Sequence, residues 1–457
     1  MSRDIYKHYL LIVLLFILAF NCVDGLALGL VLQDIKRDLS LSDTQLGLLT
    51  GIAFALFYSV MGIPIARWAD RGNRVTIIAV TAAAWSVMVA LCGLAGSFAQ
   101  LLLIRVGVGI GEAGVGPPAH SLIADYFTRA ERARAMAIYM QGNTLGIVLG
   151  YWVAGWLNQW FGWRATFIVL GLVGLVPAAL AWLTLREPRS SCARDRSTAL
   201  ISTHAPVAAA SSPDASPSLR EVCVTLWANT TFRHLLYAFS VVSFFGNGTI
   251  QWQPAFFARS YGMNTGVLGA WFTLIYGAGG MIGMYWGGVL ASRYAENNER
   301  RQLKAMAMLY CISGLLSVLI YVSPNYYWAF GWMALSTVVG SLTSAPLFAT
   351  IQTLVEPRMR AMSVAVLGLF ANLIGLGLGP LTVGALSDAL RSAAGEESLR
   401  YALIAMSPGT LWVAWHLWRA SKTVAGDLEA AQEGRDDPAS EENALLNARH
   451  ITGTSVA

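Results

Sequence analysis

Long apolar runs separated by short polar loops are the feature that most restricts what this chain can fold into. A run of about 20 apolar residues is long enough to cross the hydrocarbon core of a bilayer as a helix. We expect twelve such spans, near residues 8–31, 44–66, 75–98, 100–125, 135–157, 163–185, 233–257, 266–291, 304–322, 326–351, 361–387 and 399–418. The chain is therefore predicted to be an all-α membrane protein.

The composition agrees with lipid as the main solvent of the chain. Of the 457 residues, 56% are hydrophobic and only 12% are charged, whereas ordinary soluble domains carry roughly 25% charged residues. The net charge of +5 does not indicate a nucleic-acid partner, because the basic residues lie mainly in short loops. No CxxC pair occurs among the five cysteines, so neither a metal site nor a disulfide framework is expected.

The distribution of basic residues between the loops predicts the orientation in the membrane. With the N-terminus in the cytoplasm, most arginines and lysines fall in inner loops, and the outer side holds only Lys36, Arg37, Arg164, Arg259, Arg391 and Arg400. Both termini are then cytoplasmic, as expected for a multi-pass protein of a bacterial inner membrane. The first apolar run lacks a small-residue cleavage site and is long enough to span, so we interpret it as a retained helix.

A segment rich in serine, alanine and proline interrupts the spans after the sixth. Residues 186–231 are predicted to form a flexible cytoplasmic linker. This divides the chain into a six-helix bundle over 1–185 and a second over 232–420, followed by a polar and disordered cytoplasmic tail over 421–457.

The two halves resemble one another. The run ERARAMA at 131–137 is echoed by EPRMRAMS at 356–363. At a constant offset, Asn143, Gly146, Gly150 and Gly155 match Asn372, Gly375, Gly379 and Gly384. A parallel repeat of six helices is typical of transporters in which two similar bundles rock about a central site. The alternative is chance similarity between glycine-rich helices.

The stretch RVGVGIGEAGVG, starting at Arg105, matches GxGxxG at Gly109, Gly111 and Gly114. A dinucleotide site would need a preceding strand in a soluble βαβ unit, whereas these glycines lie inside an apolar span. Arg105 and Glu112 are seven residues apart, so they share one helix face at a separation of ~10 Å. We interpret the glycines of the opposite face as helix-packing positions.

A third charge, Asp24, lies in the first span at a depth similar to that of Arg105. Because a charge at the bilayer centre costs from about 3 to more than 10 kcal/mol, we expect Asp24 and Arg105 to pair or to face a water-filled cavity. Two plainer interpretations stay open. The pair could be a static bridge between two helices, and Glu112 could be a permanently protonated core carboxyl.

Several stretches together resemble the major facilitator superfamily. They are WADRGNR at 68–74, Arg105 with the following VGVGIGEAG, GWRATF at 162–167 and REPR at 186–189. Residues 39–71 are similar to bacterial Spinster-type lipid transporters in particular. The resemblance covers roughly residues 8–420. It implies twelve transmembrane helices in two pseudo-symmetric six-helix bundles, and a sphingoid lipid or lysophospholipid as substrate.

The resemblance also implies roles for particular residues. Asp24, Arg105 and Glu112 would couple transport to protons, and a cytoplasmic gate would contain Asp70, Arg71, Arg74 and Arg134. The sequence departs from the family pattern at Gly25, Ala66 and Ser292. These departures bear on how tightly the inner gate locks.

Polar residues within the spans suggest a substrate cavity. We expect its lining to include Arg105, Asn21, Asn143, Asn247, Gln251, Trp252, Tyr276 and Asn372. The second half carries no comparable charge inside its spans, so one wall would be charged and the other mostly apolar. Such a cavity suits an amphiphile.

The sequence therefore predicts a proton-coupled secondary transporter that moves an amphiphilic lipid by alternating access, most simply as a monomer without a cofactor. No Walker motif occurs, so the energy would come from an ion gradient. A proton-coupled multidrug or metabolite exporter of the same superfamily is the alternative. A membrane-embedded enzyme is disfavoured, because HExxH, GxSxG and a catalytic carboxylate pair are absent from the sequence.

Overall fold

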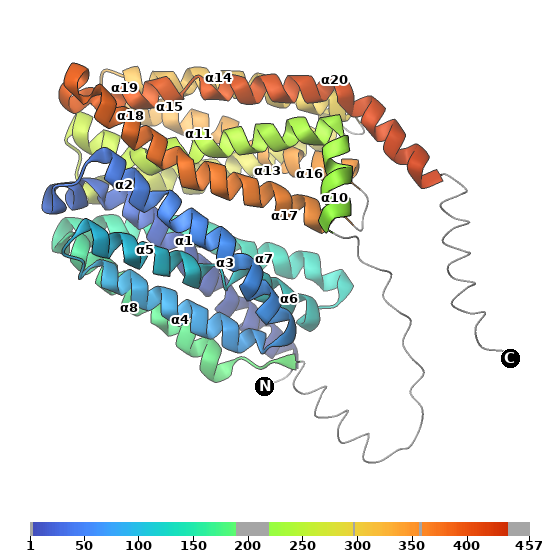
Figure 1. Cartoon of the computed structure of the whole chain (residues 1–457), viewed down its shortest axis with the longest axis horizontal. Coiled ribbons are helices and arrows are strands. Elements are labelled where there is room, and N and C mark those ends of the chain that lie inside the picture. Colours follow the sequence, from blue (N-terminus) through green and yellow to red (C-terminus); the bar gives the residue numbers. More distant parts are fainter. Residues whose placement is uncertain (1–2, 189–218, 296–297, 356–358, 437–457) are drawn as a thin grey trace, which may run out of the picture.

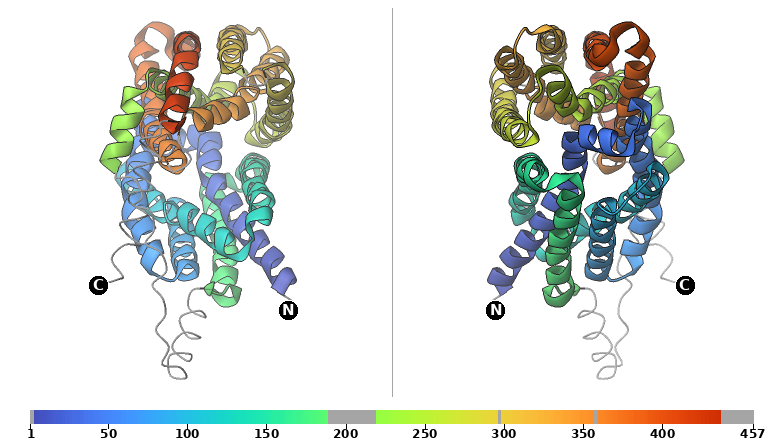
Figure 2. Two further views of the ribbon diagram at one scale, coloured as in Figure 1. Left: turned by 90° about the vertical axis from the view of Figure 1, so that its right-hand side faces the viewer. Right: turned by 90° about the vertical axis from the view of Figure 1, so that its left-hand side faces the viewer.

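The computed structural model describes residues 3–188, 219–295, 298–355 and 359–436. The regular elements in these ranges are helices, and they gather into two groups with their long axes roughly parallel (Figure 1). The first half of the chain forms one group and the second half the other, as the end-on views of Figure 2 also show. The predicted two-bundle, all-α membrane fold is confirmed.

The first bundle supplies six spans. Its elements are α1 (Arg3–Leu39), α2 (Asp43–Thr50), α3 (Ile52–Arg71), α4 (Arg74–Cys92), α5 (Phe98–Glu112), α6 (Gly116–Tyr126), α7 (Arg129–Val148), the π-helix η1 (Leu149–Val153) and α8 (Ala154–Thr184). The chain turns from the fifth span to the sixth within α8 at Gly162, whose φ of 79° is a conformation that glycine adopts without steric cost.

The second bundle follows the short helix α10 (Leu219–Ala228). Its elements are α11 (Thr230–Tyr261), α12 (Thr265–Phe272), the π-helix η2 (Thr273–Gly279), α13 (Gly280–Tyr294), α14 (Glu299–Val322), α15 (Tyr326–Ser341), α16 (Ser344–Leu354), α17 (Arg360–Phe370), the π-helix η3 (Ala371–Leu378), α18 (Gly379–Ala394), the 3₁₀-helix η4 (Gly395–Glu397), α19 (Ser398–Met406) and α20 (Gly409–Asp436).

Eight helical stretches of the described chain are long and apolar enough to cross a membrane. Two of them, Arg134–Thr184 with 51 residues and Ala365–Glu429 with 65, are long enough to hold two spans each. The 32-residue helix α11 and the α15–α16 pair complete the twelve. Several polar residues lower the mean hydropathy of α11. A turn divides α15 from α16, so these two helices do not form one uninterrupted apolar helix.

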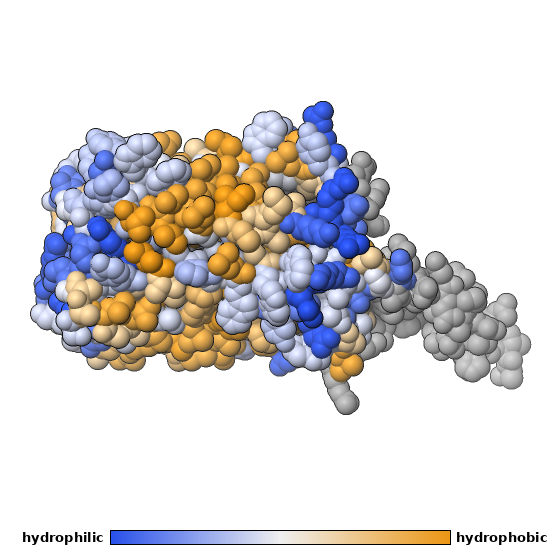
Figure 3. Space-filling model, turned by 90° about the horizontal axis from the view of Figure 1, so that it is seen from above, coloured by the Kyte–Doolittle hydropathy of each residue, from blue (hydrophilic) through white to orange (hydrophobic). Residues whose placement is uncertain are grey.

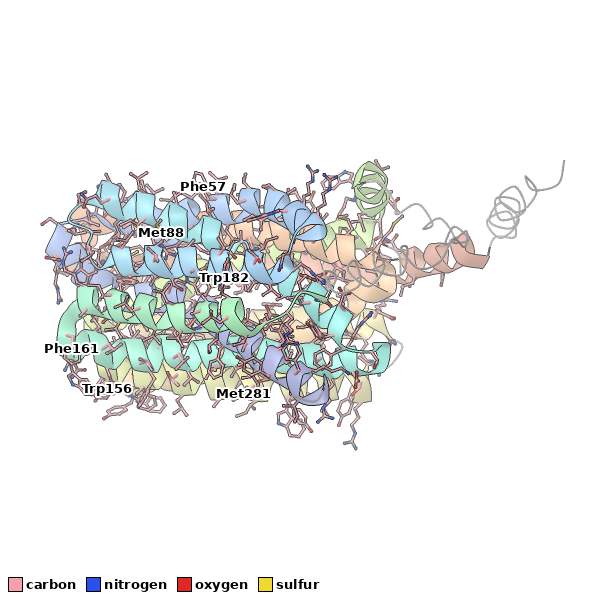
Figure 4. All side chains as sticks on the ribbon, turned by 90° about the horizontal axis from the view of Figure 1, so that it is seen from below. Phe57, Met88, Trp156, Phe161, Trp182 and Met281 are labelled. Atoms are coloured by element: carbon pink, nitrogen blue, oxygen red, sulfur yellow. The ribbon has the colours of Figure 1, made fainter. Side chains whose placement is uncertain are left out.

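The outer surface matches a bilayer. Figure 3 shows a hydrophobic band between two hydrophilic ends. Figure 4 shows Phe57 and Met281 at opposite edges of the view, and these two residues and Trp182 are 36%, 52% and 56% exposed. Trp156 and Phe161 lie together towards one end (Figure 4), as aromatic residues commonly do at membrane interfaces.

Two predicted segments differ from the described structure in part. The predicted linker 186–231 contains the helix α10, and its residues 189–218 lie outside the described ranges. The helix α20 continues to Asp436, so it includes the first sixteen residues of the segment 421–457 that we expected to form the polar tail. The repeat motif at 356–363 is described only from residue 359 onward.

α1 begins and α20 ends at one end of the molecule, which we call the termini end (Figure 1). The bundles pack closely at the opposite end, which we call the closed end. At the closed end α2 packs against α18, and α8 packs against α12. Several of the spans that meet across the bundle interface are irregular helices, broken at Gly51 or wound locally as π-helices in η1, η2 and η3. Such interruptions commonly mark functional positions in helices.

Glycines of the internal repeat lie at these crossings. A Cβ on Gly384 would lie 2.2 Å from the carbonyl oxygen of Asp43, and one on Gly155 would lie 2.6 Å from that of Thr265. Asp43 and Thr265 are the first residues of α2 and α12. Each repeated glycine therefore brings one bundle against the start of a helix in the other, in pseudo-symmetric fashion.

The other repeated glycines act inside the bundles. Gly146 packs against α1 at Ala19, and Gly375 packs against α11 at Ser243. The eleventh span therefore lies on the seventh as the fifth lies on the first. This equivalence favours a true repeat over chance similarity.

Gly384→Ala is expected to loosen the closed end, because the added methyl group has no room beside Asp43. The opening of the closed end is measured by maleimide labelling of a cysteine introduced by Ser387→Cys, at a fully buried position that contacts Asp43. The five native cysteines are replaced in all variants. We expect maleimide labelling about tenfold faster, since overpacking typically costs ~1–3 kcal/mol. Gly331→Ala, which has open space around it, is the control. Equal labelling in both variants contradicts the prediction.

Candidate functional site

Asp24 of α1 and Arg105 of α5 form a buried ion pair. The Arg105 Nη1 atom lies 2.5 Å from the Asp24 Oδ2 atom, and the two residues are 2% and 3% exposed. The guanidinium also lies over the Phe54 ring of α3, 5.3 Å from its centroid, in a cation–π arrangement. The structure therefore pairs the two residues that the sequence placed at a similar depth.

Glu112 belongs to the same cluster. It is 4% exposed, two helical turns beyond Arg105, and it interacts electrostatically with both Asp24 and Arg105. Within the described part of the chain its Oε1 atom has no hydrogen-bond partner, and neither does the Nε atom of Arg105. Two carboxyl groups and one guanidinium thus share a buried site. We call these three residues the charged cluster.

The glycines around Arg105 position α5 against its neighbours. A Cβ on Gly111 would lie 2.6 Å from the Trp85 Cβ atom of α4, and one on Gly107 would lie 2.9 Å from the Met88 sulfur. Gly109 approaches the backbone of Phe54 equally closely. The GxGxxG match is therefore a helix-packing feature.

A small cavity adjoins Asp24 between α1, α4 and α8. Its volume is about 10 Å³, which is close to the minimum that holds one water molecule. Ser86 lines it, and the buried Ser86 hydroxyl has no hydrogen-bond partner within the described residues. Gly171 and Gly174 of α8 also line it, and both pack closely against Ser86 of α4.

A larger cavity of about 420 Å³ lies within the second bundle, between α11, η2, α14, α15 and the start of α20. Of the predicted cavity residues, Asn247 and Tyr276 line it. The hydroxyl groups on its wall come from Ser243, Ser313, Ser317, Ser336, Thr337, Ser341, Ser344, Ser407 and Thr410, among others. We call it the hydroxyl-lined cavity.

Hydrogen bonds among these side chains leave acceptor positions towards the cavity. Ser317 and Ser407 are 3.1 Å apart, and Thr337 donates to the Met333 carbonyl at 2.8 Å. A hydroxyl that donates to its own helix keeps lone pairs for a ligand. Apolar side chains such as Phe245 and Ile250 form the rest of the wall, and the lining residues include no charged group.

The charged cluster does not line this cavity. The cluster lies inside the first bundle and the hydroxyl-lined cavity inside the second. The ion pair, which is strong in an apolar core, holds Arg105 beside Asp24 and Phe54. The expectation that Arg105 also faces a substrate hollow between the two bundles stays a prediction.

The remaining predicted cavity residues take other positions. Gln251 donates to the Gly25 carbonyl of the first bundle at 3.2 Å, and the fully buried Trp252 donates to the Pro380 carbonyl at 2.9 Å. Asn143 accepts a hydrogen bond from the Cys22 thiol at 3.1 Å. Asn21 and Asn372 are half-buried in α1 and η3. The predicted set is thus divided between several environments.

The predicted cytoplasmic gate residues lie at the termini end. Arg74 is fully buried, and its guanidinium binds Glu187 at 2.5 Å and Asp125 at 2.7 Å, both in its own half of the chain. Arg71 and Arg134 are exposed. Asp70 is the penultimate residue of α3, and its side chain lies outside the part of the chain that the structure describes.

Sequence reasoning missed a polar network at the closed end. Asp43 is 1% exposed and accepts hydrogen bonds from Lys36 at 2.6 Å, from Arg259 at 2.7 Å and from Ser387 at 2.7 Å. Asp388 of the second bundle accepts from the backbone N–H groups of Asp43 and Thr44, so it caps the N-terminus of α2 in the first.

The closed-end network left only a weak signal in the sequence. Arg259 is one of the few basic residues of its membrane side, and Asp43 begins a helix with a Ser42 capping box. However, the two residues are 216 positions apart, and only the tertiary fold brings them together.

Comparison with known proteins identifies the family. The family model of the Major Facilitator Superfamily matches residues 12–424. The chain belongs to this superfamily. Among solved structures, a bacterial homolog of the human lysosomal transporter Spinster, in an inward-facing and unoccupied conformation, superposes with a TM-score of 0.80 at 30% identity, covering 92% of this chain and 98% of the other.

Curated relatives within the superfamily differ in their described roles. An MFS-type efflux pump of Mycolicibacterium smegmatis is 33% identical over 388 residues, which is 84% of this chain and 85% of the relative. Protein spinster homolog 1 of Xenopus tropicalis is 24% identical over 424 residues, 87% of this chain and 78% of the relative. This superfamily member is therefore an integral membrane transporter of Spinster-like structure.

Removing one partner of the buried pair should destabilise the protein strongly. Arg105→Gln leaves Asp24 buried beside a second carboxyl, a change that typically costs ~3–5 kcal/mol. The control is Arg37→Gln, whose side chain is 73% exposed and 4.0 Å from Asp34, a surface pair worth about 0–1 kcal/mol. We expect a clearly lower melting temperature in detergent for the first variant only. Equal melting temperatures would show that the pair contributes nothing to the fold.

Proposed function

We propose that this chain is a proton-coupled secondary transporter that moves an amphiphilic lipid of the sphingoid or lysophospholipid type by alternating access. The single observation that carries the coupling is the charged cluster, in which Asp24, Arg105 and Glu112 are 2% to 4% exposed. The lipid assignment is supported by the Spinster-like structure and by the mixed lining of the hydroxyl-lined cavity.

Charge balance supports a proton as the coupling ion. With both carboxyls ionised, the charged cluster would carry one net negative charge in an apolar interior, which is strongly unfavourable. One bound proton makes the cluster neutral. A second proton would free Arg105 from Asp24, and water admitted during opening could supply it. We propose that this exchange shifts the equilibrium between the two orientations of the bundles.

The closed-end network supports an alternating-access cycle. Asp43, Arg259, Ser387 and Asp388 join the two bundles on one side of the membrane. The similar Spinster homolog is inward-facing, and we propose the same state here. The termini end would then be the open, cytoplasmic side of a bacterial inner membrane, and the closed end the outer side.

The substrate would bind with its polar head among the hydroxyl groups and its apolar part along Phe239, Phe245 and Ile250. A cavity of about 420 Å³ lies within the range of ~300–1,000 Å³ that is typical of small-molecule sites. Its neutral, hydroxyl-rich wall is suited to recognising a head group through hydrogen bonds.

A proton-coupled multidrug or metabolite exporter is the second candidate. Two observations favour it. The M. smegmatis relative, at 33% identity, is an efflux pump, and the many hydroxyl groups of the cavity could equally bind a polar molecule without an acyl chain.

Loss of the carboxyls should uncouple transport from the proton gradient. In proteoliposomes we expect Asp24→Asn and Glu112→Gln to reduce uptake driven by a pH gradient by about 5- to 150-fold, the usual range of a coupling free energy. Downhill exchange of labelled substrate should persist, because the cavity is intact. Glu396→Gln, at an 85% exposed carboxyl, is the control. Unchanged pH dependence in both cluster variants would refute proton coupling through this site.

A substrate panel separates the two candidates. We expect a lysophospholipid or sphingoid base to raise the melting temperature and compete for transport, and hydrophilic drugs to do neither. Ser317→Val should weaken lipid affinity about fivefold by removing one hydrogen bond, whereas Ser292→Val on the exposed end of α13 should not. Equal responses to lipid and hydrophilic compounds would favour the exporter.

A further inference from the structure

A second hollow lies on the flank of the second bundle, between α13, α14 and α16. Its volume is about 360 Å³, and it shares no lining residue with the hydroxyl-lined cavity. The walls are formed mainly by Leu290, Ala291, Met308, Ile312 and Leu342. We call it the flank groove.

The flank groove opens towards the surrounding lipid. Of the wall residues, Leu290, Ile312 and Met308 are 42%, 44% and 68% exposed, in the apolar parts of α13 and α14. A hollow of this kind on a membrane-spanning surface is in contact with hydrocarbon, so an acyl chain of the bilayer is the molecule that can fill it without exposing polar groups.

The termini end of the flank groove is basic. Arg301 lines it, and Arg293, Arg300 and Lys304 are exposed on the same ends of α13 and α14. Over residues 219–295, 298–355 and 359–436, none of these four side chains forms an ion pair, although Arg301 donates to the Tyr294 carbonyl at 3.3 Å. Glu299 is the acidic residue of the first turn of α14, and Glu296 lies outside the described residues.

The corresponding place in the first bundle differs. There Arg74, after the second span, is fully buried and neutralised by Glu187 and Asp125. After the eighth span, Arg293, Arg300, Arg301 and Lys304 are exposed around an apolar groove, whereas α14 begins with Glu299 where α4 begins with Arg74. The second bundle therefore presents a cluster of exposed basic side chains beside the groove, where an external anion can reach them.

We infer that the flank groove binds one acyl chain of an anionic phospholipid of the bilayer, with the lipid phosphate group on Arg301 and Lys304. The apolar groove alone would accept any acyl chain. The four exposed basic side chains select an anionic head group, by about fivefold in affinity for each basic residue near the surface. This site is separate from the transport pathway, so the inference stands independently of the proposed substrate.

Native mass spectrometry of the purified full-length protein tests this directly. The protein is released from detergent containing equal amounts of phosphatidylglycerol and phosphatidylcholine with the same acyl chains. We expect phosphatidylglycerol adducts to exceed phosphatidylcholine adducts at least fivefold for the native chain. Equal retention of the two lipids would overturn the inference.

Two pairs of variants locate the lipid. Arg301→Gln should reduce the phosphatidylglycerol preference about fivefold, and Arg37→Gln at the exposed surface of the closed end should not. Ala305→Trp should fill the flank groove and remove the adduct while keeping all four basic residues. Cys311→Trp, exposed on the same helix but outside the groove, is its control.

The outcomes discriminate between sites. If Ala305→Trp and Cys311→Trp retain the lipid equally, the acyl chain does not occupy the groove and the inference is wrong. If Arg301→Gln keeps the full lipid preference, the head group is not recognised there and the assignment fails as well. Proton-driven transport measured on the same preparations reports separately on the proposed function.

Discussion

The hydrocarbon of the bilayer is the constraint on which the rest of this structure depends. Because lipid cannot hydrogen-bond to the backbone, each span must satisfy its own amide groups as a helix, and the described chain does so in two bundles. Several of the spans that meet across the bundle interface are broken at Gly51 or wound as π-helices, whereas α1 and α11, which also meet there, are continuous helices. The irregular backbone at this interface is covered by protein.

The same constraint explains where the charges lie. Asp24 and Arg105 neutralise one another inside one bundle, so motion of one bundle against the other does not by itself break their contact. Asp43 and Arg259 neutralise one another across the interface, so opening the closed end must break that pair. On the proposed cycle, the first pair is placed to sense protons and the second to hold one of the two end states.

The two bundles have diverged from their common pattern. Repeated glycines make equivalent contacts in both, as Gly155 and Gly384 show at the interface. The interiors differ, since the first bundle contains the charged cluster and the second contains a neutral cavity lined by hydroxyl groups. The candidate coupling site and the candidate binding site therefore lie in different bundles. On the proposed cycle, a change at one site reaches the other through the interface between the bundles.

Local sequence determined the helices and the depth of the intramembrane charges, because apolar length and helical period are properties of one segment. It also indicated the glycine repeat, since a constant offset is visible without coordinates. Only the tertiary structure decided that Arg105 pairs within its own bundle, that Asp43 meets Arg259 and that serines of four different helices and one turn surround one cavity. A single serine in a span has an ordinary partner in its own helix. A serine hydroxyl becomes part of a binding site only when the packing of helices brings several such hydroxyl groups around one cavity.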